Sequence, residues 1–227
     1  MAQEEKIAEG IYLIGGPNIS RAEDATSFVI EFGKELVMID SGAGQSTMVL
    51  EQNIRSAGLD PEKITTLILT HCHIDHIGAA PHFRERFGSL ILIHDLDAQA
   101  VEEGDRIRTA ASWYGVHFPP TSVDRKLKGE EEILEFGTET LHCLHTPGHT
   151  PGSISIYLDR AGQRILFGQD IHGPFIKSFG SDIGQWKKSM TKLIALNADI
   201  LCEGHFGIFH GKEHVRRYIE RYLEEYE

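Results

Sequence analysis

The segment T-H-C-H-I-D-H at positions 70–76 concentrates side chains that bind metal ions. Within six residues it holds three imidazoles and one carboxylate: His71, His73, Asp75 and His76. Burying so many ionisable groups is costly unless they share a ligand, and a metal ion is the ligand that suits them all. In an extended conformation His71 and His73 point the same way, whereas Asp75 and His76 can face a second site on the following turn. This one segment can therefore serve two neighbouring metal ions.

Three later residues extend this set. His149 lies in T-P-G-H-T-P-G-S, Asp170 follows the run I-L-F-G-Q, and His205 follows I-L-C-E-G. Taken singly, each has a simpler interpretation as a turn histidine, a helix N-cap or an exposed loop histidine. Taken with the first cluster, they give five histidines and two aspartates at strand ends, which matches the ligand need of a binuclear metal site.

Short strands alternating with helices are predicted to position these residues. The apolar run at 64–69 predicts a buried strand that ends at the histidine cluster. Further strands are expected at 11–14, 26–32, 35–39, 90–93, 140–145, 153–158, 164–167 and 200–202. Helical spacing predicts helices at 46–57, 78–87, 96–103, 183–196 and 214–226. Strands precede helices in each half of the chain, which favours an α+β fold with two sheets and helices outside them.

The composition excludes several kinds of partner. The chain has 227 residues with 22 Lys and Arg against 34 Asp and Glu, and the resulting net charge of −12 disfavours nucleic acid and anionic membranes. No apolar stretch predicts a membrane span, and the acidic N-terminus does not resemble a signal peptide. Three cysteines without paired spacing suit a reducing compartment. We therefore expect a cytoplasmic protein, with self-association into a homo-oligomer left open.

Residues 104–129 interrupt the alternation of strands and helices. The segment has two consecutive prolines, several aromatic residues and no clean period. Irregular segments of this length inside a domain are usually functional. We therefore interpret residues 1–227 as a single domain with an insertion at 104–129 that covers a pocket. Four residues are candidates for substrate contact: Tyr114 and His117 in this segment, and His172 and Phe206 beside the later ligands.

The order of these motifs resembles the metallo-β-lactamase superfamily over essentially the whole chain. The motifs are D-S-G at 40–42, T-H-x-H-x-D-H at 70–76, T-P-G-H-T-x-G at 146–152, G-x-D at 168–170 and G-H at 204–205. The resemblance implies a four-layer αββα sandwich with the metal site at one edge between the sheets. It also implies that Asp40 accepts a hydrogen bond from a ligand histidine and so orients it. The implied ligands are His71, His73 and His149 for one metal, Asp75, His76 and His205 for the other, and Asp170 for both.

This ligand set implies hydrolysis. A pair of divalent cations lowers the pKa of bound water from about 15.7 toward about 7 and polarises a carbonyl group. We expect a binuclear metallo-hydrolase whose metal-bridging hydroxide attacks a small ester, lactone or thioester, with Asp75 orienting the nucleophile or moving its proton. Zinc is the expected metal, and iron and manganese are alternatives.

Departures from subfamily patterns narrow the choice of reaction. The G-x-D motif at Asp170 resembles the glyoxalase II and lactonase side of the family rather than the antibiotic-hydrolysing enzymes. The following segment, I-H-G-P-F-I-K-S-F-G-S-D, lacks the cysteine and the glycine–arginine pair expected of glyoxalase II itself. Two other classes stay open. One is an oxidoreductase that resembles the persulfide dioxygenases, with one iron on His71, His149 and Asp170, and the other is a di-iron redox or sensor protein.

Overall fold

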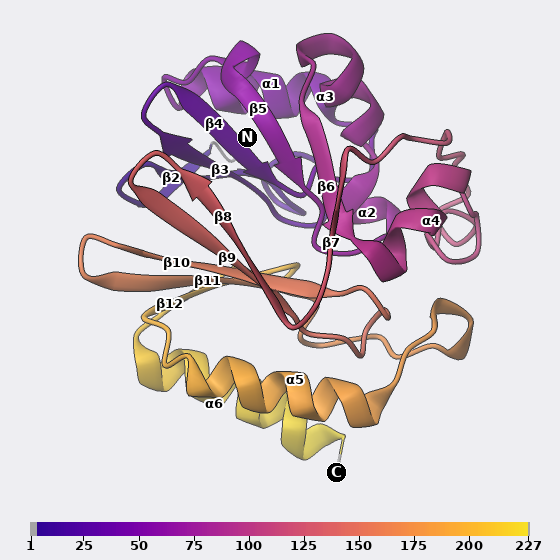
Figure 1. The fold of residues 1–227 in the computed structure, drawn as a ribbon, viewed down its shortest axis with the longest axis vertical. Coiled ribbons are helices and arrows are strands. Elements are labelled where there is room, and N and C mark those ends of the chain that lie inside the picture. Colours follow the sequence, from indigo (N-terminus) through magenta and orange to yellow (C-terminus); the bar gives the residue numbers. More distant parts are fainter. Residues whose placement is uncertain (1–3, 227) are drawn as a thin grey trace. The chain divides into compact units, whose positions relative to one another are not determined.

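Two sheets, each with its own helices, make up the computed structural model of this protein, which describes residues 4–226 (Figure 1). The chain divides into Met1–Leu127, which we name unit 1, and Lys128–Glu227, which we name unit 2. One sheet lies in each unit.

The sheet of unit 1 has seven strands in sequential order. They are β1 Glu5–Ala8, β2 Ile11–Gly15, β3 Ser27–Phe32, β4 Glu35–Ile39, β5 Ile64–Ile68, β6 Leu90–His94 and β7 Arg125–Leu127. Strands β1 to β4 pair antiparallel, and β4 to β7 pair parallel. Parallel neighbours need long crossover connections, and the helices of this unit lie in those connections.

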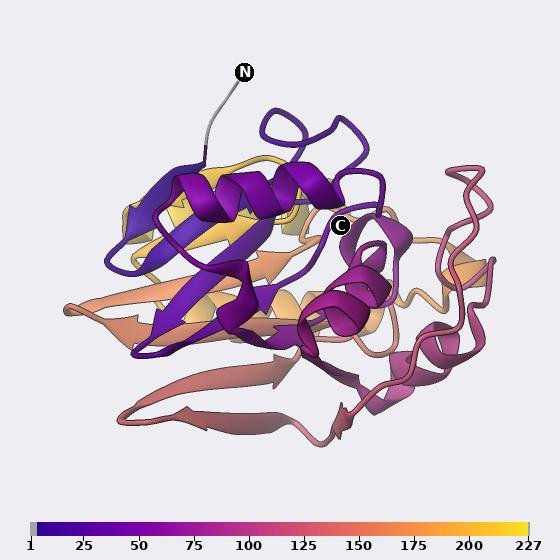
Figure 2. The same cartoon turned by 90° about the horizontal axis from the view of Figure 1, so that it is seen from above.

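The helices of unit 1 are α1 Thr47–Ser56, the 3₁₀ turn Pro61–Lys63, α2 Ile74–Ile77, α3 Ala80–Phe87 and α4 Asp95–Glu103. Helix α1 lies along one face of the sheet and contacts β2 (Figure 2). Its Leu50 and Ile54 are fully buried in the apolar core of the unit. Gly15 permits this approach, because a methyl group there would lie 2.6 Å from the Leu50 side chain.

The sheet of unit 2 has six strands in the order β13-β12-β11-β10-β9-β8. They are β8 Glu131–Phe136, β9 Glu139–His145, β10 Ile154–Arg160, β11 Gln163–Gln169, β12 Ile200–Glu203 and β13 Ile208–His210. Strands β11 and β12 pair parallel, and helix α5 Ile183–Ala195 is their crossover. Helices α5 and α6 Lys212–Glu225 lie side by side against one face of this sheet (Figure 1). A short 3₁₀ turn, Lys177–Phe179, precedes α5.

Parallel strand pairs determine where each unit collects polar residues. In unit 1, β4 and β5 run side by side, and Asp40 and His71 follow their carboxyl ends. In unit 2, Gln169 at the end of β11 is paired with Glu203 at the end of β12, so Asp170 and His205 emerge at the same edge. Ligands commonly bind outside the carboxyl ends of parallel strands.

Most predicted strands and helices are confirmed, with shifts of at most two residues at their ends. Several short elements were missed, among them β1, α2, β8 and β13. The prediction that 104–129 is irregular throughout was wrong at its end, where Arg125–Leu127 forms β7. Two of these three residues are charged and exposed, so their sequence carries no apolar alternation. Among the described residues, no helix is both long and apolar enough to cross a bilayer.

Candidate metal centre

Three histidines of unit 1 gather just beyond β5. The ring centroid of His71 lies 4.7 Å from that of His73 and 4.1 Å from that of His76, and all three side chains are buried. Helix α2 carries Asp75 and His76, and Oδ2 of Asp75 lies 3.8 Å from Nε2 of His76. The four predicted ligands of the first cluster therefore lie close together in a buried part of the unit.

Asp40 fixes the orientation of His76. The Nδ1 atom of His76 donates to Oδ2 of Asp40 at 2.7 Å, and the backbone N–H and hydroxyl of Thr70 donate to the same carboxylate at 2.8 and 2.7 Å. The φ angle of Asp40 is +55°, in the left-handed region that non-glycine residues rarely adopt. A strained backbone of this kind persists where the surrounding contacts hold it, and at Asp40 those contacts are made by the histidine segment.

Other backbone contacts hold the histidine segment of unit 1 in place. The N–H of Cys72 donates to Oδ2 of Asp97 at 3.1 Å, and the N–H of Ile74 donates to the carbonyl of Thr109 at 2.7 Å. Sequence reasoning missed Asp97 and Thr109, because both lie far along the chain in segments without a motif. Burial, followed by the nearby Asp97 carboxylate, raises the pKa of the Cys72 thiol well above its usual range. Cys72 is thus held as a neutral, buried thiol that fills space.

In unit 2, Asp170 lies between two histidines. Its Oδ2 atom is 3.4 Å from Nε2 of His149, and its Oδ1 atom is 3.3 Å from Nε2 of His205. The Asp170 side chain is 4% exposed. Each carboxylate oxygen faces a different imidazole, which is the arrangement that a carboxylate shared by two metal ions requires.

His149 is held by a tight turn and by the chain that follows Asp170. Its Nδ1 atom donates to the carbonyl of Pro174 at 2.9 Å, and the Ser181 hydroxyl donates to its carbonyl at 2.6 Å. Gly148 has a φ of +143°, and a methyl group there would lie 2.3 Å from Cβ of Trp186. Only glycine fits between this turn and α5, which explains the residue before His149 in the T-P-G-H motif.

Glu203 organises the loop that carries His205. The Glu203 side chain is fully buried, and its Oε2 atom accepts hydrogen bonds from the backbone N–H groups of His205 at 2.7 Å and Phe206 at 2.9 Å. Its Oε1 atom lies 3.0 Å from Nδ1 of His172. Gly204 is required here as well, because a methyl group would lie 2.3 Å from Oδ1 of Asp170. Sequence reasoning missed Glu203, whose only signal was a carboxylate at the end of an apolar strand.

The four predicted substrate residues fall into two groups. In unit 2, His172 and Phe206 lie beside the ligands, with ring centroids 4.7 Å apart, and Phe206 is 59% exposed. The Tyr226 hydroxyl at the end of α6 donates to the carbonyl of His172 at 3.3 Å. In unit 1, Tyr114 and His117 have exposed side chains on the coil that follows α4.

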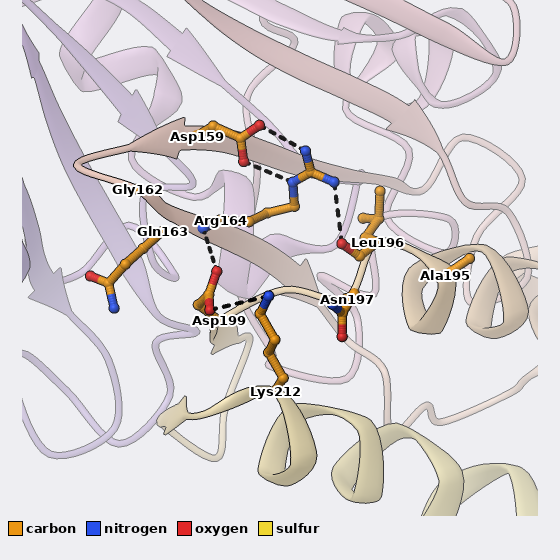
Figure 3. Close-up of a pocket in the computed structure, with 9 residues that line it drawn as sticks. All are labelled: Asp159, Gly162, Gln163, Arg164, Ala195, Leu196, Asn197, Asp199 and Lys212. Atoms are coloured by element: carbon orange, nitrogen blue, oxygen red, sulfur yellow. Dashed lines mark hydrogen bonds and ion pairs between the residues drawn. The ribbon is translucent and has the colours of Figure 1, made fainter.

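A pocket of about 510 Å³ in unit 2 lies away from these residues (Figure 3). It opens at the amino ends of β11 and β12. Asp170 follows the carboxyl end of β11, so the length of this strand separates the pocket from Asp170 by about 20 Å. Arg164 pairs with Asp159 at 2.7 Å and donates its backbone N–H to Asp199 at 2.8 Å, and Asp199 lies 3.7 Å from Nζ of Lys212 (Figure 3). These charges satisfy one another, so we assign this pocket a structural role.

The donor set suits a transition metal. The Nδ1 atom of His76 donates to the buried carboxylate of Asp40, and that of His149 donates to the carbonyl of Pro174. This leaves Nε2 as the nitrogen of each ring that can bind a metal. Imidazole and carboxylate ligands suit zinc, iron and manganese, whereas calcium and magnesium prefer oxygen alone. The residues present therefore fit the metal that the sequence predicts.

Comparisons with known proteins find relatives that are named as a thioesterase and a hydrolase. The sequence is 28% identical to an acyl-coenzyme A thioesterase of Gallus gallus, over 93% of this chain and 82% of the relative. It is 27% identical to a hydroxyacylglutathione hydrolase of Haemophilus influenzae, over 77% and 81% of the two chains. The structure matches a mutant metallo-β-lactamase from Cronobacter sakazakii with a TM-score of 0.85 and 21% identity, covering 100% of this chain and 96% of that one.

The structural match confirms the predicted fold class. The sequence profile of the metallo-β-lactamase superfamily matches residues 21–205, which is most of the chain. This protein belongs to the metallo-β-lactamase superfamily and has the fold of that superfamily.

Proposed function

We propose that this protein is a binuclear metallo-hydrolase that cleaves small acyl thioesters, and that esters and lactones are weaker substrates. The observation that carries the proposal is Asp170, whose two oxygens face His149 and His205 at 3.4 and 3.3 Å. A carboxylate in this arrangement can be shared by two cations, and two cations are what a bridged hydrolytic site needs.

The proposed ligands come from both units. Seven side chains would hold two divalent ions, with zinc as the first choice: His71, His73, Asp75, His76, His149, Asp170 and His205. Such ions, when bound, supply a water of lowered pKa and polarise a carbonyl oxygen. Because the proposed ligands come from both units, we propose that residues 1–227 act as one functional domain.

The side chains around this set have separate tasks. The Asp40 carboxylate keeps the His76 ring in one orientation through its 2.7 Å hydrogen bond. The carboxylate of Asp75, buried in α2, can accept a proton from an attacking water and pass it on. The exposed Phe206 would contact the acyl chain. We also propose that residues 104–129 cover the substrate pocket, with Tyr114 and His117 at its entrance.

A thioester is the favoured substrate because the two sequence relatives described above are named an acyl-coenzyme A thioesterase and a hydroxyacylglutathione hydrolase. The net charge of −12 favours a small molecule over a nucleic acid. None of the three cysteines forms a disulfide, in keeping with our proposal of a cytoplasmic location.

The test is a substrate panel assayed with matched zinc, iron and manganese forms of the protein. It contains acyl-coenzyme A and S-acylglutathione thioesters, lactones and aryl esters. We expect thioesters to give the highest kcat/KM, with about two zinc ions bound per chain. Oxygen uptake with glutathione persulfide, one iron per chain and no acyl hydrolysis would instead establish the dioxygenase class.

Asp170→Ala should abolish most of the activity and reduce the bound zinc to about one ion or fewer per chain, because a shared ligand is lost from both sites. Metal analysis after dialysis measures the stoichiometry. Asp159→Ala, which removes an exposed carboxylate near the other end of the strands, is the matched control. Unchanged stoichiometry and rate in Asp170→Ala would rule out the shared-ligand assignment.

A further inference from the structure

Three side chains of unit 2 form a group of possible ligands, and one of them, His172, is not in the proposed ligand set. Asp170, His172 and His205 each offer one ligand atom, and these atoms all lie within 4.8 Å of one another. The closest measured pair, Oδ1 of Asp170 and Nε2 of His205, is 3.3 Å apart. Two ligands that are each about 2.1 Å from one ion lie roughly 3 to 3.5 Å apart at tetrahedral angles. The spacing therefore suits a single bound cation.

The ring of His172 is held by a buried carboxylate. Its Nδ1 atom lies 3.0 Å from Oε1 of Glu203, whose side chain has no exposure to solvent. The other oxygen of Glu203 accepts from the backbone N–H groups of His205 and Phe206. The ring also contacts the rings of His205 and Phe206, with centroids 5.2 and 4.7 Å away. Glu203 thus fixes two members of the group, the His172 ring and the His205 backbone.

A metal-binding histidine usually donates its second ring nitrogen to a carboxylate or a carbonyl. His172 has such a partner, as His76 and His149 do. His142 shows that a carboxylate partner alone does not make a histidine a candidate metal ligand. Its Nδ1 atom lies 2.7 Å from the exposed carboxylate of Glu131, but it belongs to no group of three possible ligands within the described part of the chain. His172 has both a carboxylate partner and two other possible ligands nearby.

We propose that His172 binds a metal ion through Nε2, and that Asp170, His172 and His205 form a site of two histidines and one carboxylate within unit 2. This donor set suits divalent iron, zinc, cobalt or manganese. Glu203 is its positioning residue. The inference rests on the proposed metal centre but not on the thioester substrate, and it replaces the predicted role of His172 in substrate contact.

Because all three ligands belong to unit 2, the site does not depend on the histidines of unit 1. A His71→Ala/His73→Ala/His76→Ala variant should therefore still bind about one Co²⁺ per chain, with the absorption bands of a nitrogen- and oxygen-ligated ion. Adding His172→Ala to this variant should weaken Co²⁺ binding by at least about 100-fold. Adding His214→Ala, on an exposed position of α6, should leave it unchanged. Equal Co²⁺ affinities in the His172→Ala and His214→Ala combinations would overturn the proposal.

A second measurement uses the wild-type sequence and does not depend on the folding of any variant. The protein is labelled with ¹⁵N at histidine and loaded with ¹¹³Cd²⁺. A direct ¹¹³Cd–¹⁵N coupling at Nε2 of His172 is expected, and its absence while His205 shows one would refute the assignment. Wild-type protein that shows this coupling but hydrolyses no acyl substrate would contradict the proposed function and leave the metal site intact.

Discussion

The two nitrogen atoms of a histidine ring differ in function once one of them has a fixed hydrogen-bond partner. In His76 the Nδ1 atom donates to Asp40, and in His149 it donates to the Pro174 carbonyl. In each case the hydrogen bond fixes the direction of Nε2. In the proposed metal centre, the partner would therefore matter as much as the ring, although it would not contact the ion itself.

Asp40→Ala tests this dependence on a partner. Loss of the carboxylate removes the hydrogen-bond acceptor that orients the His76 ring. We therefore expect the affinity for zinc to fall about 10- to 100-fold. Competition with a chromophoric chelator measures the affinity. Asp40→Asn, whose side-chain oxygen can still accept from Nδ1, should recover much of the loss. Equal losses in the two variants would indicate that the negative charge, and not the orientation of the ring, is what matters.

The proposed ligand residues could be identified in the sequence more readily than the groups that orient them. The H-x-H-x-D-H motif is local, and it follows an apolar run that ends at a known position. The role of Glu203 depends instead on the register of β11 with β12, which pairs Gln169 with Glu203. Register between strands separated by a helix is not encoded in any short pattern, so this carboxylate could be found only in the structure.

At the level of elements, strands with a continuous apolar run were predicted well, and short polar ones were not. β5 is buried at four of its five positions and was found from sequence. β8 has one buried residue among six, so its composition resembles a loop. Helix α2 has four residues, which is too few for a periodic signal. Tertiary contacts, and not local preference, determine these elements.

Helix α5 contributes Trp186, which packs closely against the Gly148 turn, so the start of this helix affects the position of His149. Asp182 caps the helix by accepting from the backbone N–H of Gln185 at 2.9 Å, and this hydrogen bond holds the pKa of Asp182 below its usual range. A carboxylate with a lowered pKa stabilises the folded state above its unfolded pKa of about 3.9, and the stabilisation is lost as the pH falls through the folded value.

The prediction is a pH-dependent difference between wild type and Asp182→Ala. The wild type should melt at a higher temperature at pH 7, and the difference should shrink as the pH is lowered from 5 to 3, because a protonated Asp182 is a weaker acceptor. Calorimetry of the apo forms measures it without interference from metal release. A difference that stays constant over this range would show that the ionised carboxylate does not contribute to the cap.

At the scale of the whole molecule, the fold class and the seven proposed ligands followed from the order of motifs in the sequence. The division into two units did not, because no linker or change of composition marks residue 127. The unit 2 group of Asp170, His172 and His205 also required the structure. Its three members are spread over 36 positions, and His172 alone has no motif.

Removal of metal should destabilise both units if both supply ligands, as we propose. A ligand that binds only the folded state at 100 times its Kd adds about 2.7 kcal/mol to the free energy of unfolding. Treatment with a chelator should lower the melting temperature, and added zinc should restore it. Hydrogen exchange should increase at 70–76 and also at 146–152 and 203–206. An increase confined to one of the two units would contradict the proposal that the ligands come from both.

The contact made by Tyr226 has a practical consequence. Its hydroxyl holds the carbonyl of His172, and its ring packs against Phe175 and Trp186 with centroids 4.9 and 5.4 Å away. Replacing Tyr226 with alanine would remove both contacts and so disturb the backbone of a proposed metal ligand, although Tyr226 itself is not proposed to bind metal.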